Sequence, residues 1–500
     1  MFKKLLFIGT LLISACTKVE DVPLPVTTSN ETALNFYKQA LVHVSQGEWP
    51  EGRESFQSAL RIDPNFVMAN LYGWTNDPVQ NRKYRETAAA NKDKASEAER
   101  IMVEMWQAGR EGKSDKRLEL AKELVEKYPS SSEAYVELGN MLREKYNFDE
   151  SIKSYEKAIE INPDSYDAWQ ALAQFHIAGG TYIMLPNEQQ DKSLGIKYAE
   201  ELIRIRPMSP GAHQLRANIE RQYSNFEEAN VLYQKMIDVC NETGSTAKST
   251  ALIVSAHTLM FSGQLENSMK RYDEAIAIAE SPQTAHNLKF YKAVANLFEN
   301  KFYDGLEVLD EMMDDVGETS NSKERVNGNT SQIHWHRMMM HGHNQQKSEA
   351  FKSLNQWKKY RKINLDMDDE RAVENHNASN YAMEAWMHTL FGDYDKAKNL
   401  LSKHYEILKD REGSGALDNY KGISGMVYVM QGNPKKALEF FDDRIEPANY
   451  QYYSYFKALA LKANQRLDEA NEIFEFIANF NFLSWEAGLT RNLAQKELES

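Results

Sequence analysis

Residues 132–163 constrain the fold of this chain more than any other segment, because they form one complete helix–turn–helix unit. Apolar and small residues recur at spacings of three and four over 132–142, which predicts a first helix, and over 151–158, which predicts a second. Pro163 ends the second helix, since proline disfavours helical geometry in the residue before it. The facing residues of the two helices are Tyr135, Leu138, Gly139, Leu142, Ser151, Tyr155 and Ala158. Such a unit cannot bury its apolar face alone, so it must stack on neighbours.

Weaker copies of this unit fill most of the chain. The next copy keeps the phase in its first helix, and an insertion at Gly179–Lys192 delays its second helix. Together the copies predict about 11–12 helix pairs, at spacings of roughly 34 residues upward. Marker positions of the further copies include Gly52, Phe56, Ala59, Ala121, Ala217, Ala229, Tyr233, Ala256, Ser268, Tyr272, Ala293, Gly305, Ala350, Ala397, Gly425, Ala437, Ala458 and Ala470. No run of alternating strands appears, so the chain is predicted to be all-α.

The unit at residues 132–163 resembles the tetratricopeptide repeat (TPR) family in its period and in its packing positions. The resemblance extends over about residues 33–480. It implies an α-solenoid in which helix pairs stack as a right-handed superhelix with a concave surface. It is more specific for fold than for function, because the motif residues are packing residues.

Breaks in the helical pattern divide the chain. We expect a signal peptide at 1–15, a flexible tether at 16–32, an N-terminal repeat array at 33–313, and a more degenerate array at 331–500 that ends in a capping helix. The polar stretches expected to interrupt the helices are Asp314–Thr330, Lys362–Ser379 and Lys409–Asp418. The first of them is a candidate joint, near residue 320, about which two arms of one superhelix flex.

The leader predicts where the protein works. MFKKLLFIGTLLISAC has a basic start and a short apolar run that ends in small residues and Cys16, as in a secretory signal. Its last four residues resemble the bacterial lipobox, which implies that Cys16 is acylated and anchors the chain in a membrane. Thr17 at the next position implies the outer membrane. Glu20-Asp21 is similar to an acidic signal for transfer to the cell surface, but its spacing is imperfect, and both the periplasmic and the surface-exposed side stay open. The alternative is a cleaved signal in which Cys16 is incidental.

Composition excludes several functions. The formal net charge of −14 should repel nucleic acid phosphates, so no nucleic acid partner is expected. Phosphate-binding glycine loops, HExxH and GxSxG are all missing from the sequence, and no enzyme activity or cofactor is predicted. Two cysteines, Cys16 and Cys240, cannot make a disulfide framework.

The segment His334–His343 contains four histidines and invites comparison with a metal site. On one helix, however, the pairs seven residues apart lie roughly 10 Å from each other. Only a helix break at Gly342 would bring His341 and His343 together, so no metal is predicted. Among the tryptophans, Trp169 and Trp357 occupy packing positions and are expected in the core.

The TPR resemblance also implies a binding surface, since first helices line the concave groove in that family. The predicted partner-binding residues are Glu133, Val136, Asn140, Arg143, Asp167, Gln170, Gln174, Gln214, Asn218 and Gln222. These residues are mostly polar and suit a peptide backbone or an oligosaccharide. The clamp that some relatives use for a C-terminal carboxylate is missing, because Tyr37 and Leu41 fill two of its positions.

These features predict a non-enzymatic, lipid-anchored scaffold of a Gram-negative outer membrane that docks a protein partner in its groove. The alternative is a glycan-binding or accessory lipoprotein of a polysaccharide-uptake system, similar to SusD-like proteins, which are also lipid-anchored and partly built from TPR helices. Those proteins have few repeats and large insertions, whereas repeats here run almost end to end.

Overall fold

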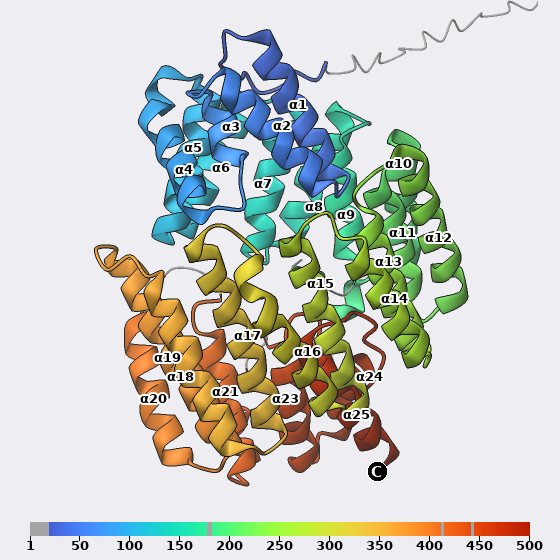
Figure 1. The fold of residues 1–500 in the computed structure, drawn as a ribbon, viewed down its shortest axis with the longest axis vertical. Coiled ribbons are helices and arrows are strands. Elements are labelled where there is room, and N and C mark those ends of the chain that lie inside the picture. Colours follow the sequence, from blue (N-terminus) through green and yellow to red (C-terminus); the bar gives the residue numbers. More distant parts are fainter. Residues whose placement is uncertain (1–19, 178–182, 412–414, 442–444) are drawn as a thin grey trace, which may run out of the picture.

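The computed structural model describes residues 20–177, 183–411, 415–441 and 445–500, and these residues form α-helices joined by turns (Figure 1). The first helices are α1 (Glu31–Ser45), α2 (Trp49–Ile62), α3 (Val67–Tyr72), α4 (Pro78–Asn91), α5 (Glu97–Glu111), α6 (Ser114–Lys127), α7 (Ser132–Glu144), α8 (Phe148–Ile161), α9 (Tyr166–Phe175), α10 (Lys192–Ile205), α11 (Pro210–Gln222) and α12 (Phe226–Thr243). The remaining α-helices are α13 (Lys248–Phe261), α14 (Leu265–Ala277), α15 (Pro282–Ala295), α16 (Phe302–Asp315), α17 (Lys323–His343), α18 (Lys347–Ile363), α19 (Glu370–Leu390), α20 (Tyr394–Leu408), α21 (Asp418–Met430), α22 (Pro434–Ala437), α23 (Gln451–Ala463), α24 (Leu467–Ala478) and α25 (Trp485–Glu499). Short 3-10 helices are η1 (Lys92–Lys94), η2 (Asn187–Gln189), η3 (Asn296–Glu299) and η4 (Val316–Glu318).

Consecutive helices pack in pairs, α1 with α2, α3 with α4, and so on to α23 with α24. The described residues thus contain twelve successive pairs, and α25 follows them and packs on α23 and α24. No strand occurs in the described ranges. The predicted all-α solenoid of 11–12 helix pairs is confirmed.

The pair α7–α8 has the close packing that its sequence predicts. A Cβ added at Gly139 would lie 2.5 Å from the ring of Tyr155, so the two helices approach closely because this position has no side chain. The Ser151 hydroxyl donates to the Gly139 carbonyl at 2.7 Å. The pair α13–α14 repeats this contact, since the Ser268 hydroxyl donates to the Ala256 carbonyl at 2.8 Å. Small residues therefore set the distance between helices in both pairs.

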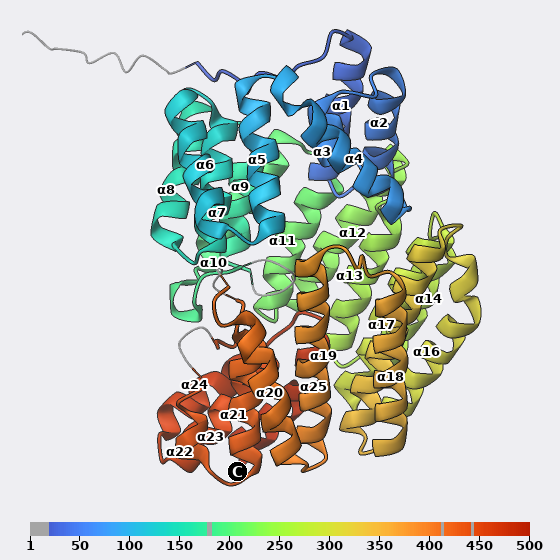
Figure 2. The ribbon, with the colours of Figure 1, turned by 90° about the vertical axis from the view of Figure 1, so that its left-hand side faces the viewer.

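The stack curves until distant helices meet. The blue and cyan helices α1–α9 form one end of the molecule, and the yellow to red helices form the other (Figures 1 and 2). Between these ends, α4 contacts α17. Both guanidinium nitrogens Nη1 and Nη2 of Arg82 donate to the carboxylate of Glu324, at 2.6 and 2.9 Å, and Ser322 donates to Asp77 at 3.1 Å. We call this the α4–α17 contact. The C-terminal helix α25 likewise packs on η3.

The polar stretches are shorter interruptions than the sequence predicts. Helix α17 already begins at Lys323 and α19 at Glu370, so the expectation of loops throughout Asp314–Thr330 and Lys362–Ser379 is wrong. Side-chain caps explain the difference: Ser322 accepts from the Arg325 amide and Asp369 from the Ala372 amide. Whether the two arms flex near residue 320 stays a prediction.

Part of the expected tether is bound to the solenoid. Asp21 accepts from the amide and the hydroxyl of Ser132, both at 2.9 Å, and from the Asn162 side chain at 2.8 Å. Further along, the Leu24 amide donates to Glu133 at 3.0 Å. We call residues 21–28 the N-terminal strap. A carboxylate at the start of α7 is favourable because the amides there lack helical partners, so the expectation of a flexible coil is wrong for the strap.

The leader, including Cys16, lies outside the described residues. Among the residues that are described, none of the helices combines the length and hydropathy needed to cross a membrane.

Candidate functional site

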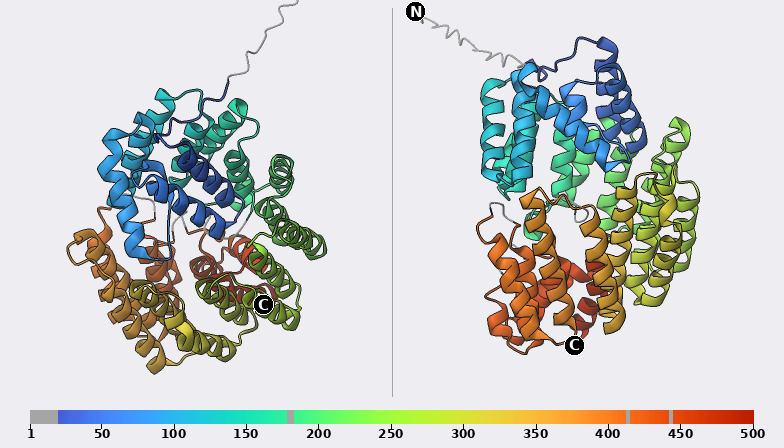
Figure 3. Two further views of the ribbon diagram at one scale, coloured as in Figure 1. Left: turned by 45° about the horizontal axis from the view of Figure 1, so that its top comes forward. Right: turned by 60° about the vertical axis from the view of Figure 1, so that its left-hand side comes forward.

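A cavity of about 1030 Å³ lies where three distant parts of the chain meet, and we call it the central cavity. The N-terminal contribution comes from α2 and the residues after α3, the middle one from α11, α13 and α15, and the C-terminal one from the residues before and at the start of α25. Figure 3 shows that the blue and cyan, green, and orange to red helices follow one another around the molecule. Side chains that line the cavity include Trp49, Arg53, Trp74, Gln214, Asn218, Arg221, His257, Gln283, Asn287, Tyr291, Arg325, Phe482, Trp485 and Glu486.

Aromatic side chains supply the apolar walls of the central cavity. Trp49 is 56% exposed and makes an edge contact with Trp74, with ring centroids 6.2 Å apart. Tyr291, on the middle wall, is 41% exposed. Trp485 packs against Trp335 and Trp386 at 5.4 and 5.5 Å. Exposed aromatic faces of this kind can bind a ligand with little loss of side-chain entropy, because an aromatic side chain has few rotatable bonds.

Arg221 and His257 are two buried residues of the middle wall with side-chain nitrogens that form no hydrogen bond among the described residues. Arg221 is 1% exposed, and its Nη1 donates to the Val254 carbonyl at 3.3 Å. His257 is 4% exposed, and neither of its ring nitrogens bonds to any described residue. Burial, followed by the nearby Arg221 charge, holds the pKa of His257 well below its usual range. The imidazole is therefore neutral, with one nitrogen as donor and one as acceptor.

Two of the ten predicted partner-binding residues, Gln214 and Asn218, line the central cavity. The Asn218 side-chain oxygen also accepts from the Tyr233 hydroxyl at 2.6 Å. Asn140 is held in the same way by Tyr155, at 2.8 Å. These asparagines occupy equivalent places in their pairs, so each one fixes the tyrosine of its own second helix.

The other predicted residues do not line the central cavity. Several of them already form hydrogen bonds with other parts of the chain. Arg143 donates from Nε to the Ile183 carbonyl at 2.6 Å and from Nη1 to Gln174 at 3.2 Å. Glu133 accepts from the strap, and the Gln222 carbonyl accepts from Asn481 at 3.2 Å. Val136 and Gln170 are half-buried on α7 and α9. Binding of a partner by these residues stays a prediction.

An acidic surface lies on α7 and α9 near the strap. Burial, and then the negative charge of Asp167, raises the pKa of Glu137 to about 7. Burial likewise raises the pKa values of Glu133 and Asp167 above their usual ranges. Asp167 and Glu133 are exposed, so these carboxyl groups lie at the surface rather than in the core.

A second, smaller hollow of about 480 Å³ lies among α17, α18 and α19. Trp335, Trp357 and Arg361 line it, and the guanidinium of Arg361 lies 4.5 Å from the Trp357 ring. Trp335 also contacts Trp485 of the central cavity, so one aromatic cluster separates the two spaces. Trp357 is buried, as predicted, and Trp169 is half-buried against Tyr198 at 5.7 Å.

The histidines of His334–His343 have packing roles. Helix α17 continues through Gly342, so this glycine does not break the helix. His343 lies against the rings of Trp386 and Tyr452, and burial lowers its pKa to about 3. In the described ranges no group of three or more potential ligands could hold a metal ion. Burial raises the pKa of Cys240 to about 12, which favours the protonated thiol over the nucleophilic thiolate.

Sequence reasoning missed Arg53, Arg221, His257 and Arg325 because they meet only when the stack curves. One signal for Arg221 exists in the sequence. Ser131 and Ser209 cap the first helices of their pairs, α7 and α11. Arg221 follows Ser209 at the same interval as Arg143 follows Ser131. Equivalent positions in a repeat face equivalent surfaces, so predicting Arg143 implied Arg221 as well.

Comparison with known proteins identifies part of the array. A family model described as TPR repeat matches residues 139–177, from the middle of α7 to the end of α9. The chain contains a tetratricopeptide repeat. The TPR match falls on the segment with the clearest repeat pattern in the sequence.

Two solved structures are similar to this chain. One is a tetratricopeptide repeat protein from Parabacteroides merdae, with 12% identity, a TM-score of 0.33, and coverage of 60% of this chain and 98% of that one. The other is the human IFIT1 dimer with m7Gppp-AAAA, with 13% identity, a TM-score of 0.37 and coverage of 90% of both chains.

Proposed function

We propose that this protein is a non-enzymatic scaffold that docks an extended segment of a partner protein in the central cavity. The TPR match supports a role in protein interaction. The observation that carries the proposal is the cavity itself, where side chains from α2, α11, α13, α15 and the start of α25 line one preformed space. A space formed before binding lowers the entropy cost of association.

The chemistry of the cavity matches a peptide. Gln214 and Asn287 place side-chain amides in the cavity lining, and amides can donate to or accept from a backbone in an extended conformation. The Asn287 oxygen already accepts from Gln283 at 3.0 Å, so its amide nitrogen is the group offered to a ligand. Trp49 and Tyr291 offer apolar faces for its side chains, and aromatic residues dominate the energetics of such interfaces.

Variants of the exposed aromatics test the docking site. Purified protein carrying Trp49→Ala or Tyr291→Ala, used as bait on detergent-solubilised envelope, should recover a stoichiometric partner less well than the wild type. Tyr303→Ala is the matched control, because Tyr303 is a 66% exposed aromatic on α16 outside the cavity. Equal recovery by all variants would exclude the central cavity as the docking site.

A glycan ligand is the second candidate, favoured by one observation. Trp49 exposes more than half of its surface at the cavity, and an exposed indole face stacks on sugar rings. This is the role of a binding or accessory lipoprotein in a polysaccharide-uptake system. Retardation of the wild type, but not of Trp49→Ala, in a polysaccharide-containing gel would support it, provided that the bait recovers no protein partner.

We further propose that acylated Cys16 anchors the scaffold at the outer membrane of a Gram-negative cell. The support is the leader sequence that ends in Ile13-Ser14-Ala15-Cys16. Because the strap is bound from Asp21 onward, the cysteine precedes the solenoid by only a few residues. Cys16→Ala should shift the protein from the membrane fraction to the soluble fraction and abolish labelling with a radioactive fatty acid.

A further inference from the structure

The guanidinium of Arg221 is buried without a carboxylate partner among the described residues. Besides the bond to Val254, its cationic carbon lies over the rings of Tyr233 and Phe482, at 5.8 and 5.5 Å from their centroids. Its Nε has no hydrogen-bond partner within the described ranges. A buried cation costs several kcal/mol unless an anion and hydrogen bonds compensate for lost water. In the unbound protein Arg221 therefore lacks a counterion and a hydrogen-bond partner for its Nε among the described residues.

His257, on the same part of the cavity wall, also has unpaired nitrogens among the described residues. It lies on α13, next to the α11 helix that bears Arg221, and both residues line the central cavity. The His257 ring lies against the rings of Tyr272 at 5.8 Å and Tyr291 at 5.5 Å, and its nitrogens form no hydrogen bond with a described residue. Two adjacent first helices thus present buried nitrogens, Arg221 Nε and both ring nitrogens of His257, that have no hydrogen-bond partner among the described residues.

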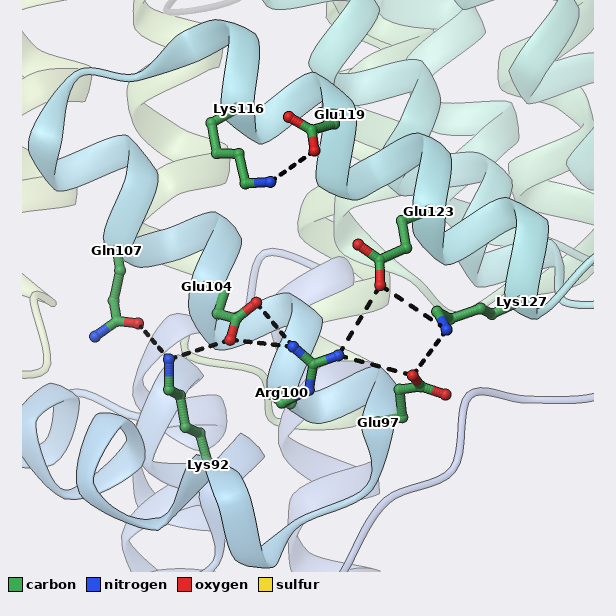
Figure 4. Close-up of polar contacts among 9 residues, drawn as sticks. All are labelled: Lys92, Glu97, Arg100, Glu104, Gln107, Lys116, Glu119, Glu123 and Lys127. Carbon is green, nitrogen blue, oxygen red and sulfur yellow. Dashed lines mark hydrogen bonds and ion pairs between the residues drawn. The ribbon is translucent and has the colours of Figure 1, made fainter.

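Arg100 provides a comparison, because its charge is paired with carboxylates of the chain itself. On α5 its guanidinium lies among three carboxylates, with N···O distances of 3.0 Å to Glu104, 3.7 Å to Glu97 and 3.9 Å to Glu123 (Figure 4). The chain has an excess of acidic residues, yet within its described part the hydrogen bond that Arg221 makes goes to a carbonyl and not to a carboxylate. Arg221 therefore differs from Arg100 in having no counterion among the described residues.

We propose that an acidic side chain of the docked partner segment completes this wall, its carboxylate accepting from Arg221 and from His257. The inference rests on the proposed function and names the partner as an acidic, extended peptide. A planar guanidinium binds a carboxylate through two parallel hydrogen bonds, which are short and charge-assisted. Arg53 and Arg325 add positive charge to the same lining, against Glu280 and Glu486.

Two pools of short random peptides, both with amidated C-termini, test the proposal on the full chain. One pool contains Asp and Glu, and the other has Asn and Gln instead, so that only side-chain carboxylates differ. We expect the immobilised wild type to retain the acidic pool preferentially. Arg221→Met should weaken that retention about tenfold to a hundredfold, as loss of a buried charged contact does. Arg100→Met is the matched control and should retain peptides as the wild type does.

The outcomes separate the two proposals. Retention of both pools equally would leave peptide docking in place and overturn the acidic specificity. Retention of neither pool, with binding of alginate oligosaccharides, would overturn both and indicate an acidic glycan. Thermal denaturation checks that each variant is folded. If Arg221→Met is unfolded, Arg221→Lys replaces it: a severalfold loss is then expected, because lysine keeps the charge without the planar pair of donors, and unchanged retention would overturn the proposal.

Discussion

Gly139 and Tyr155 face each other across the α7–α8 pair with no space for a methyl group between them. A Cβ at residue 139 would lie 2.5 Å from Cε1 of the tyrosine ring and 2.8 Å from Cδ1. The ring itself is fully buried, and its hydroxyl is fixed by Asn140. This contact holds together the pair that the TPR model matches.

Gly139→Ala should therefore destabilise the protein by about 1–3 kcal/mol, the usual cost of overpacking a close helix contact. Urea denaturation followed by circular dichroism measures the change. Gly317→Ala is the control, because a Cβ at residue 317 meets no atom within 4 Å. Equal effects of the two substitutions would contradict the packing seen for α7 and α8.

The α4–α17 contact should limit access of proteases to residues 314–330. In wild-type protein we expect no early cleavage there. Glu324→Arg would place like charges beside Arg82 and should speed cleavage of this segment, although global stability changes by less than about 1 kcal/mol, as is typical of exposed pairs. Combining it with Arg82→Glu restores the attraction and should restore protection. Rapid cleavage of the wild type would instead favour two arms that flex near residue 320.

The strap should stabilise the first turn of α7. Asp21→Ala removes the three hydrogen bonds to Ser132 and Asn162, and we expect a loss of about 0.5–2 kcal/mol, as for other helix caps. Hydrogen exchange at the start of α7 should accelerate, while exchange in α23 should not change. Glu20→Ala is the control because Glu20 is an exposed acid outside the strap. Unchanged exchange in Asp21→Ala would show that the strap detaches in solution.

Glu486 should make stability depend on pH. Burial raises the pKa of its carboxyl to about 7, and the group accepts from the Tyr452 amide at 2.8 Å. Since the folded state binds the proton more tightly than the unfolded chain, this stabilisation is complete below about pH 4.5 and is lost as pH rises through about 7.

Glu486→Gln keeps an acceptor for Tyr452 and cannot ionise. It should match the wild type at pH 5 and exceed it at pH 8 by about 1–3 kcal/mol, less than full linkage predicts because the side chain is partly exposed. Denaturant titrations at both pH values measure the difference. A variant less stable than wild type at pH 8 would mean that the start of α25 stabilises the carboxylate.

The sequence predicts local packing well because the repeat encodes it locally. Gly139, Ser151 and Tyr155 contact one another within a single unit, so their spacing is sufficient to place them. Arg221 and Trp485 meet in one cavity only because the superhelix curves, and the curvature sums small rotations that no single unit specifies. The loops predicted for the polar stretches are too long for a related reason. Ser322 and Asp369 cap helices, and composition alone does not distinguish a helix cap from a loop residue.

The bond between Arg82 and Glu324 joins residues that are 242 positions apart. In most solenoids each repeat is stabilised by contacts with its adjacent repeats alone. Further bridges join Asn481 to the carbonyl of Gln222 and Asn492 to that of Phe298. Open solenoids tolerate removal of an end, because the remainder keeps all its neighbours. Here a truncation at either terminus removes contact partners of the opposite part of the chain. Shortened versions should therefore unfold at a lower temperature as a whole, rather than keep the stability of the remaining repeats.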